Sequence, residues 1–203
     1  MSVFFAPLIV LFLVVVYSVV HSLLASNKIK HLVRNLFGSY TGRWYRLAYN
    51  IFAFISLLPV LALPALLPDK SLYVIPPPWM YLMSLGQVLA VGLLIIGFLQ
   101  TGMWSFLGIR QLITGDEQAQ TCLEVRGLYH YVRHPLYTAG LLFIWMTPVM
   151  TINVLALYLG LTVYIIIGAY LEEGRLVQEF GTAYEDYKKG TPMLVPFVKG
   201  SIR

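Results

Sequence analysis

Long apolar stretches with few charged side chains are the feature that most restricts how this chain can fold. Three of them, at about residues 3–24, 44–67 and 79–103, are each long enough for a helix that crosses a bilayer, which needs about 20 apolar residues. A fourth, at about 136–171, is too long for one such helix and barely long enough for two. Charged residues make up 11% of the chain, whereas a soluble domain carries about 25%. The sequence therefore predicts an integral membrane protein.

The fourth apolar stretch contains residues that favour a turn near its middle. Pro148 cannot donate a helix hydrogen bond, and Asn153 favours turns. We therefore expect a tight helical hairpin with arms at about 136–150 and 154–171. At about 1.5 Å per residue, the first arm would reach only partway across a hydrocarbon core of about 30 Å. The predicted fold is an all-α integral membrane protein with about five transmembrane helices, the last two forming this hairpin, followed by short C-terminal helices.

The charged residues predict which ends of these helices face the cytoplasm. Thirteen of the fourteen Lys and Arg residues fall on one side of the predicted membrane, and Lys70 alone falls on the other. Positively charged connections stay in the cytoplasm, so we expect the N-terminus outside and the C-terminus inside, in a prokaryotic inner or plasma membrane. The first apolar stretch has no basic segment before it and no good cleavage site after it, so we expect a retained span rather than a removed signal peptide.

Several classes of function are disfavoured by the motifs present. The single cysteine, Cys122, excludes an intramolecular disulfide and a CxxC metal site. His130 and His134 are four residues apart, but Pro135 biases His134 away from a helix and no third ligand is near, so no metal is expected. No nucleotide-binding glycine motif is present, and the net basic charge of a membrane protein reflects topology rather than nucleic-acid binding.

Two polar, aromatic-rich segments bracket the predicted hairpin, and the first is residues 126–137. Pro135 suits the first turn of a helix, where its missing N–H would have no partner. The free N–H groups after it form an end that can bind an anion. An interfacial helix start with a snorkelling arginine explains the same residues equally well. The residues that would form the anion socket are Arg133, His134, Leu136 and Tyr137.

The second polar segment is residues 172–197. Glu172 and Glu173 are adjacent and would point about 100° apart on a helix, so at most one of them is expected to face a pocket. Alternatively, Glu172 is a solvated residue bonded to Arg175 one turn later. Both segments are expected on the cytoplasmic side, which predicts a shared site there.

The rest of the second segment predicts a helix whose tyrosines could cover a ligand, followed by an extended tail. Gly181 is expected to cap one helix. Tyr184 and Tyr187, three residues apart, would share a face of the next helix that can cover an aromatic ring or a cation. Pro192 and Pro196 would end that helix and return the tail as an extended strap.

The order of these motifs carries a resemblance. The pattern G-L-Y-x-Y-V-R-H-P-x-Y, an apolar hairpin, and then E-E-x-x-L-x-x-x-F-G-x-x-Y-x-x-Y-x-x-x-x-P-x-x-x-P resembles the isoprenylcysteine carboxyl methyltransferase family, part of a wider set that includes phospholipid N-methyltransferases. It covers roughly residues 122–199. The resemblance implies S-adenosylmethionine as cofactor and a lipophilic substrate in the bilayer. It also implies a transmembrane anchor at residues 1–110 and a methyltransferase core at 111–203.

The resemblance assigns roles to individual residues. It implies catalytic roles for Glu172, His134 and Arg133. Together with the helix-start argument for Leu136, it places the cofactor at Gly127, Tyr129, His134, Pro135, Leu136, Tyr137, Glu172, Tyr184 and Tyr187.

One position departs from the family pattern. The eukaryotic carboxyl methyltransferases have an arginine four residues before the pocket carboxylate, where this chain has Gly168. A thiol, amine or hydroxyl substrate is therefore as consistent with the sequence as a carboxylate. Such a nucleophile would lose a proton, so a base would be needed, either Glu172 or His134.

Two other functions remain open at this stage. Sterol reductases, which use NADPH, end in a similar R-H-P-x-Y and G-x-x-Y pattern, although they usually have more spans and a longer insertion before the motif. A non-catalytic membrane scaffold or sensor is the other alternative.

Overall fold

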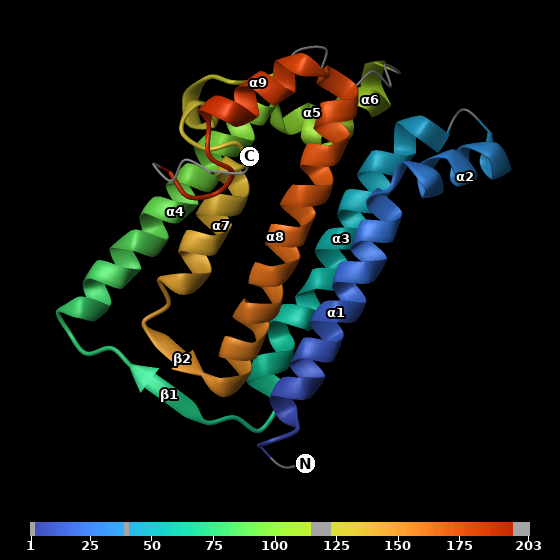
Figure 1. Ribbon diagram of the computed structural model, residues 1–203. Helices are drawn as coiled ribbons and strands as arrows, with labels where there is room; N and C mark the ends of the chain where they lie inside the picture. Colours follow the sequence, from blue (N-terminus) through green and yellow to red (C-terminus); the bar gives the residue numbers. More distant parts are fainter. Residues whose placement is uncertain (1–2, 39–40, 115–122, 197–203) are drawn as a thin grey trace. The chain divides into compact units, whose positions relative to one another are not determined.

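The computed structural model describes residues 3–38, 41–114 and 123–196, and these segments are mostly helical. Two compact units divide the chain (Figure 1). The first unit comprises Met1–Tyr73, Gly102–Ala119 and Met150–Leu161, and the second comprises Val74–Thr101, Gln120–Val149 and Thr162–Arg203. Cys122 and the residues after Pro196 lie outside the described segments.

The first unit is built on helices α1 (Ala6–Ala25) and α3 (Thr41–Leu66), with the first turns of α8 (Ile152–Phe180). Its core is a small cluster of aliphatic side chains: Val10, Val14, Val60, Ala156 and Leu157. Helix α2 (Asn27–Phe37) connects α1 to α3, and the short helices α5 (Met103–Leu107) and α6 (Ile109–Thr114) pack near the start of α3.

The second unit holds α4 (Trp79–Thr101), the 3₁₀ turn η1 (Gly127–His130), α7 (Pro135–Trp145), the rest of α8 and α9 (Thr182–Gly190). Helices α4 and α7 pack side by side over most of the length of α7 (Figure 1). Small residues permit this approach, because a Cβ atom added at Gly97 would lie 2.8 Å from Leu136 Cδ2. The packing holds the first turn of α7, which directly follows Arg133 and His134, against the long helix α4.

The predicted break in the fourth apolar stretch is present, but it contains a short strand as well as a turn. Helix α7 has 11 residues, so the first arm is short, as expected. Between α7 and α8 lies strand β2 (Val149–Thr151), which pairs with β1 (Ser71–Val74), so the expectation of a purely α-helical fold was wrong in this detail. Asp69 holds the start of α8 by accepting a hydrogen bond of 3.1 Å from the backbone N–H of Asn153.

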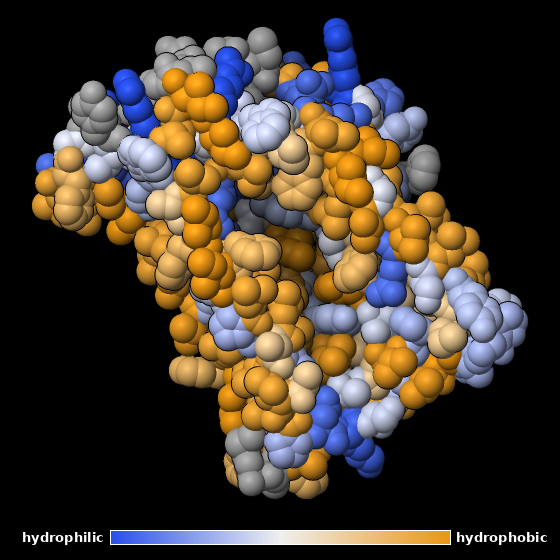
Figure 2. Space-filling view, turned by 180° about the vertical axis from the view of Figure 1, so that it is seen from behind, coloured by the Kyte–Doolittle hydropathy of each residue, from blue (hydrophilic) through white to orange (hydrophobic). Residues whose placement is uncertain are grey.

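Within residues 3–38, 41–114 and 123–196, four helices are long and apolar enough to cross a membrane: α1, α3, α4 and α8. Exposed apolar side chains cover much of the face seen in Figure 2, as a lipid environment requires. The chain is therefore a multi-pass membrane protein. The fifth expected span is the short helix α7. Helix α8 continues to Phe180, nine residues beyond the arm expected to end at Leu171, so Glu172 and Glu173 lie within one continuous helix.

Valine at Gly97 should destabilise the protein, because its side chain would collide with Leu136. Overpacking of this kind costs about 1–3 kcal/mol. Gly92→Val is the matched control on the same helix, since no heavy atom lies within 4 Å of a Cβ added there. Thermal unfolding midpoints in one detergent compare the two variants, and equal midpoints would contradict the packing described for α4 and α7.

Candidate active site

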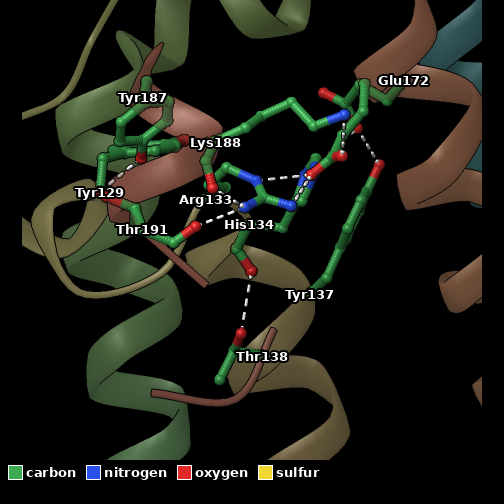
Figure 3. A network of polar contacts seen from close by, with 10 residues as sticks. Tyr129, Arg133, His134, Tyr137, Thr138, Glu172, Tyr187, Lys188 and Thr191 are labelled. Carbon is green, nitrogen blue, oxygen red and sulfur yellow. Dashed lines mark hydrogen bonds and ion pairs between the residues drawn. The ribbon is translucent and has the colours of Figure 1, made fainter. Parts of the chain in front are cut away.

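Three segments distant in sequence meet in the second unit: the start of α7, the end of α8, and α9 with the tail that follows it (Figure 3). Arg133 joins them. Its Nε and Nη2 atoms each lie 2.6 Å from Glu173 Oε1 on α8. Its Nη1 donates to the carbonyl oxygens of Lys188, at 3.1 Å, and Thr191. One guanidinium thus binds both a helix side chain and the end of another helix, using the several donors that arginine offers.

Glu173 is the most buried carboxylate of this network, with 4% of the residue exposed. Besides Arg133, the Lys188 ammonium lies 3.2 Å from its Oε2 atom, and His134 Nε2 lies 3.5 Å from its Oε1 atom. A buried charge is tolerated only when it is paired and hydrogen-bonded. The contacts of Glu173 meet that condition, so this carboxylate is committed to holding the three segments together.

Glu172, the neighbouring carboxylate, has a different environment. Its side chain is 36% exposed, and its Oε2 atom accepts a hydrogen bond of 2.7 Å from the Tyr137 hydroxyl. His134 Nδ1 lies 3.7 Å from the same oxygen, and the His134 ring stacks on Tyr137 at 5.3 Å between ring centroids. Among the described residues no ion pair joins Glu172 to Arg175, which was the alternative considered from the sequence. Glu172 is therefore the carboxylate left accessible for a ligand.

The helix start predicted at Pro135 is confirmed. Pro135 is the first residue of α7, and His134 precedes it as the N-cap. His134 is 5% exposed, and its Nε2 atom has no hydrogen-bond partner within the described residues, although Glu173 lies at 3.5 Å. The 3.5 Å contact is longer than an ordinary hydrogen bond and leaves the ring nitrogen unsatisfied, so it contributes as an electrostatic contact.

The tail returns along α7 as the predicted strap. The backbone N–H groups of Arg133 and His134 donate to the carbonyl oxygens of Pro192, at 2.9 Å, and Met193, at 3.1 Å. The Thr138 hydroxyl donates to the carbonyl of Leu194 at 2.7 Å. These bonds satisfy backbone donors that would otherwise be unpaired at the helix start.

The tyrosines predicted to form a cover lie on α9. Tyr184 is 1% exposed, and Tyr187 donates a hydrogen bond to the carbonyl of Tyr129. Their rings contact edge to face, with centroids 5.9 Å apart. Burial raises the pKa of both hydroxyls above the ordinary value of 10, so both stay protonated at neutral pH. Gly181, at φ +56°, lets the chain turn between α8 and α9.

Gly127 and Tyr129 connect the loop before α7 to α4. Gln100 Oε1 accepts a hydrogen bond of 3.0 Å from the Leu128 N–H, and the Tyr129 hydroxyl lies 2.9 Å from Thr101 Oγ1. Gly127 has φ +60°, and a Cβ atom there would lie 2.1 Å from the Gln100 amide nitrogen. The positive φ therefore favours glycine at this position, and a larger residue would also displace the Gln100 side chain.

The structure thus brings together most residues expected from the sequence, but it shows contacts that the sequence did not predict. The sequence assigned no role to Glu173 or Lys188. Glu173 could not be told apart from Glu172, because the orientation of the helix was not known, and the contact of Lys188 depends on the same orientation. No heavy atom of the described residues lies within 4 Å of a Cβ added at Gly168, so a side chain would fit beside them. Among the described residues, no group of three or more His, Cys, Asp or Glu side chains could hold a metal ion.

Replacing Glu173 by glutamine should strongly destabilise the fold, because Arg133 and Lys188 lose their shared carboxylate. Removing one partner of a buried ion pair costs about 3–5 kcal/mol. Glu185→Gln, at an exposed position of α9, is the control and should change stability by less than about 0.5 kcal/mol. Thermal unfolding and protease resistance in detergent give the comparison. Equal stability of the two variants would show that the network does not hold the segments together.

Comparisons with known proteins match the same part of the chain. A family model described as "Phospholipid methyltransferase" matches residues 85–186, just over half of the chain. The chain is 35% identical to the Methanethiol S-methyltransferase of Crocosphaera subtropica over 130 residues, covering 59% of this chain and 51% of that protein. It is 39% identical to Methanethiol S-methyltransferase 2 of Bradyrhizobium diazoefficiens over 108 residues, covering 50% and 42%. No solved structure matches significantly.

A third relative, the Methanethiol S-methyltransferase of Mycobacterium tuberculosis, is 31% identical over 97 residues, covering 46% of this chain and 40% of that protein. The matched segments therefore span about half, or less, of the length of these curated relatives. The family match contains the first polar segment, both carboxylates of α8 and Tyr184 of α9, and it ends one residue before Tyr187. On this match, the chain belongs to the phospholipid methyltransferase family.

Proposed function

We propose that this protein transfers a methyl group from S-adenosylmethionine to a small lipophilic thiol. The family match and the names of the relatives support methyl transfer and a thiol acceptor. The observation that carries the proposal is the arrangement of Glu172, Tyr137 and His134 at the start of α7, beside the tyrosines of α9. Gly168, which stands where the carboxyl methyltransferases have an arginine, also favours a substrate without a carboxylate.

The residues of the site fit the proposed cofactor. Glu172 is accessible, so its carboxylate can accept hydrogen bonds from an ammonium or from ribose hydroxyls. His134 Nε2 and the Tyr184 hydroxyl are buried polar atoms without hydrogen-bond partners among the described residues, and a polar ligand would satisfy them. The faces of Tyr137 and Tyr187, which are only partly buried, suit a sulfonium cation. The N–H groups of Leu136 and Tyr137, at the helix start, suit a carboxylate.

The chemistry of the proposed reaction is a displacement at carbon. Bound S-adenosylmethionine would supply a methyl group on a positively charged sulfur. A thiolate sulfur would form the new C–S bond as that C–S bond breaks, leaving a neutral thioether and S-adenosylhomocysteine. The thiol must first lose its proton, and an alkyl thiol is mostly protonated at neutral pH, since even the more acidic cysteine thiol has a pKa of about 8.5. We infer that Glu172 accepts this proton, with His134 orienting the carboxylate from 3.7 Å.

For Arg133 the contacts suggest a positioning role beside the catalytic one expected from the sequence, and we propose the positioning role. Its guanidinium binds Glu173 and two tail carbonyls, so we propose that it positions the start of α7 against α8 and α9. Positioning of this kind contributes to rate because the reacting atoms must be held in line. Gly127, Pro135 and Tyr187 are proposed to shape the cofactor loop and its cover.

The orientation in the membrane is also a proposal. The excess of Lys and Arg on one side supports an N-terminus outside and a C-terminus inside, with the site facing the cytoplasm. We further propose that residues 1–110 serve as anchor and substrate access, and that residues 111–203 form the methyltransferase core.

Calorimetry of the purified full chain in detergent tests the cofactor. We expect binding of S-adenosylhomocysteine, and at least about tenfold weaker binding for Glu172→Gln, because a hydrogen bond to a charged group is worth about 1.5–3 kcal/mol. Glu179→Gln, an exposed change on the same helix, should bind as the unaltered chain does. Absence of binding by folded, unaltered protein would refute the proposal.

Transfer of a labelled methyl group tests the acceptor. The full chain is offered methanethiol, a farnesylated cysteine analogue and phosphatidylethanolamine in parallel, and we expect label in the thioether product alone. A kcat that falls in Glu172→Gln and recovers at higher pH, where the thiol ionises unaided, would support the assigned base. Label in either of the other acceptors, with none in the thioether, would exclude the thiol.

A further inference from the structure

Helix α2 lies outside the part of the chain that matches the family, and the methyl-transfer proposal gives it no role. It begins at Asn27, where the Ser26 hydroxyl oxygen accepts a hydrogen bond of 3.4 Å from the Ile29 N–H. It ends at Gly38, which has φ +84°. The sequence alone did not predict this helix, because its apolar residues are too few for a span.

The sequence of α2 separates two kinds of residue onto two faces. Apolar residues recur at a spacing of three and four, which places them along one side of a helix. They are Ile29, Leu32, Val33 and Leu36. The opposite side and its flanks carry polar and basic residues: Asn27, Lys28, Lys30, His31, Arg34 and Asn35. This pattern is typical of helices that lie in the plane of a membrane surface.

Only part of the apolar face is covered by the protein. Ile29 and Val33 are half-buried, whereas Leu32 is 51% exposed, Leu36 is 68% exposed and Phe37 is 72% exposed. Exposed neighbouring apolar side chains need an apolar partner. Helix α2 joins the end of α1 to the start of α3, and both of these are candidate spans, so it lies where the chain leaves and re-enters the membrane (Figure 1).

The charge of residues 26–46 indicates which kind of molecule would bind the exposed side of α2. Residues 26–46 contain five basic side chains and no acidic one: Lys28, Lys30, Arg34, Arg43 and Arg46. Basic residues near an anionic membrane surface contribute about 1 kcal/mol each. A second copy of the same basic helix would be repelled. Anionic phospholipid headgroups, with acyl chains beneath them, complement both the charge and the exposed apolar side chains.

We propose that α2 is an interfacial helix that buries Leu32, Leu36 and Phe37 among acyl chains and binds anionic phospholipid headgroups through Lys28, Lys30 and Arg34. The helix gives the first unit a binding surface for acidic lipid beside the ends of α1 and α3. Its role is separate from the proposed methyl transfer and does not depend on it.

Spin labels on single cysteines test the position of the helix. The full chain, with Cys122→Ser, is reconstituted in nanodiscs containing phosphatidylcholine and phosphatidylglycerol. Labels at residues 32 and 36 should be accessible to oxygen and protected from a water-soluble nickel complex, and labels at 31 and 35 should show the reverse. Equal nickel accessibility at all four positions would place the helix in water. Spin–spin broadening between copies at residue 36 would show a protein partner instead, and either result would overturn the proposal.

Lipid selectivity tests the headgroup contact. The association of spin-labelled phosphatidylglycerol relative to phosphatidylcholine is measured for the unaltered chain and for Lys28→Gln/Lys30→Gln. We expect the preference for phosphatidylglycerol to fall about threefold or more, since each basic residue contributes about 1 kcal/mol before screening. The matched double change Lys70→Gln/Lys189→Gln removes the same charge elsewhere and should have little effect. Equal losses in the two variants, or no loss in either, would overturn the proposal.

Discussion

The ion pair between Arg133 and Glu173 is the interaction on which the rest of the candidate site depends. Two nitrogen atoms of the guanidinium lie 2.6 Å from one carboxylate oxygen, and both side chains are largely buried. Such a pair is weak evidence for net stability, because desolvation offsets much of its attraction. We propose that it contributes specificity, since this placement of α7, α8 and α9 is the one in which Arg133 and Lys188 both reach Glu173.

The pairing of Glu173 with Arg133 and Lys188 leaves Glu172, the neighbouring carboxylate, in a different environment. Adjacent residues on a helix diverge by about 100°, so the two carboxylates of α8 face different partners, although the His134 ring lies beside both of them. Glu172 therefore stays partly exposed, with the Tyr137 hydroxyl and the His134 ring beside it. One carboxylate holds the structure and the other remains available for chemistry, which is a division of roles that a single residue could not provide.

The sequence predicted the helices better than the connections. Hydropathy located α1, α3 and α4 to within a few residues, because a bilayer span needs a long apolar run and little else. Pro148 and Asn153 located the break before α8, but the pairing of β1 with β2 depends on residues about 80 positions apart, which local pattern cannot show. Helix α2 was missed for the opposite reason, because an interfacial helix is short and mixed in polarity. The polar segments were located correctly, whereas the contacts of Glu173 and Lys188 required knowledge of how α8 and α9 face each other.

The strap formed by residues 192–194 has a consequence for how the protein is made. The backbone N–H groups of Arg133 and His134 find their acceptors about 60 residues later in the chain. During synthesis the ribosome must therefore deliver the start of α7, the whole of α8 and the whole of α9 before these donors are satisfied. Until then the Arg133 side chain lacks two of its carbonyl acceptors. Site assembly is consequently a late event in biogenesis, and it follows translation of the preceding helices.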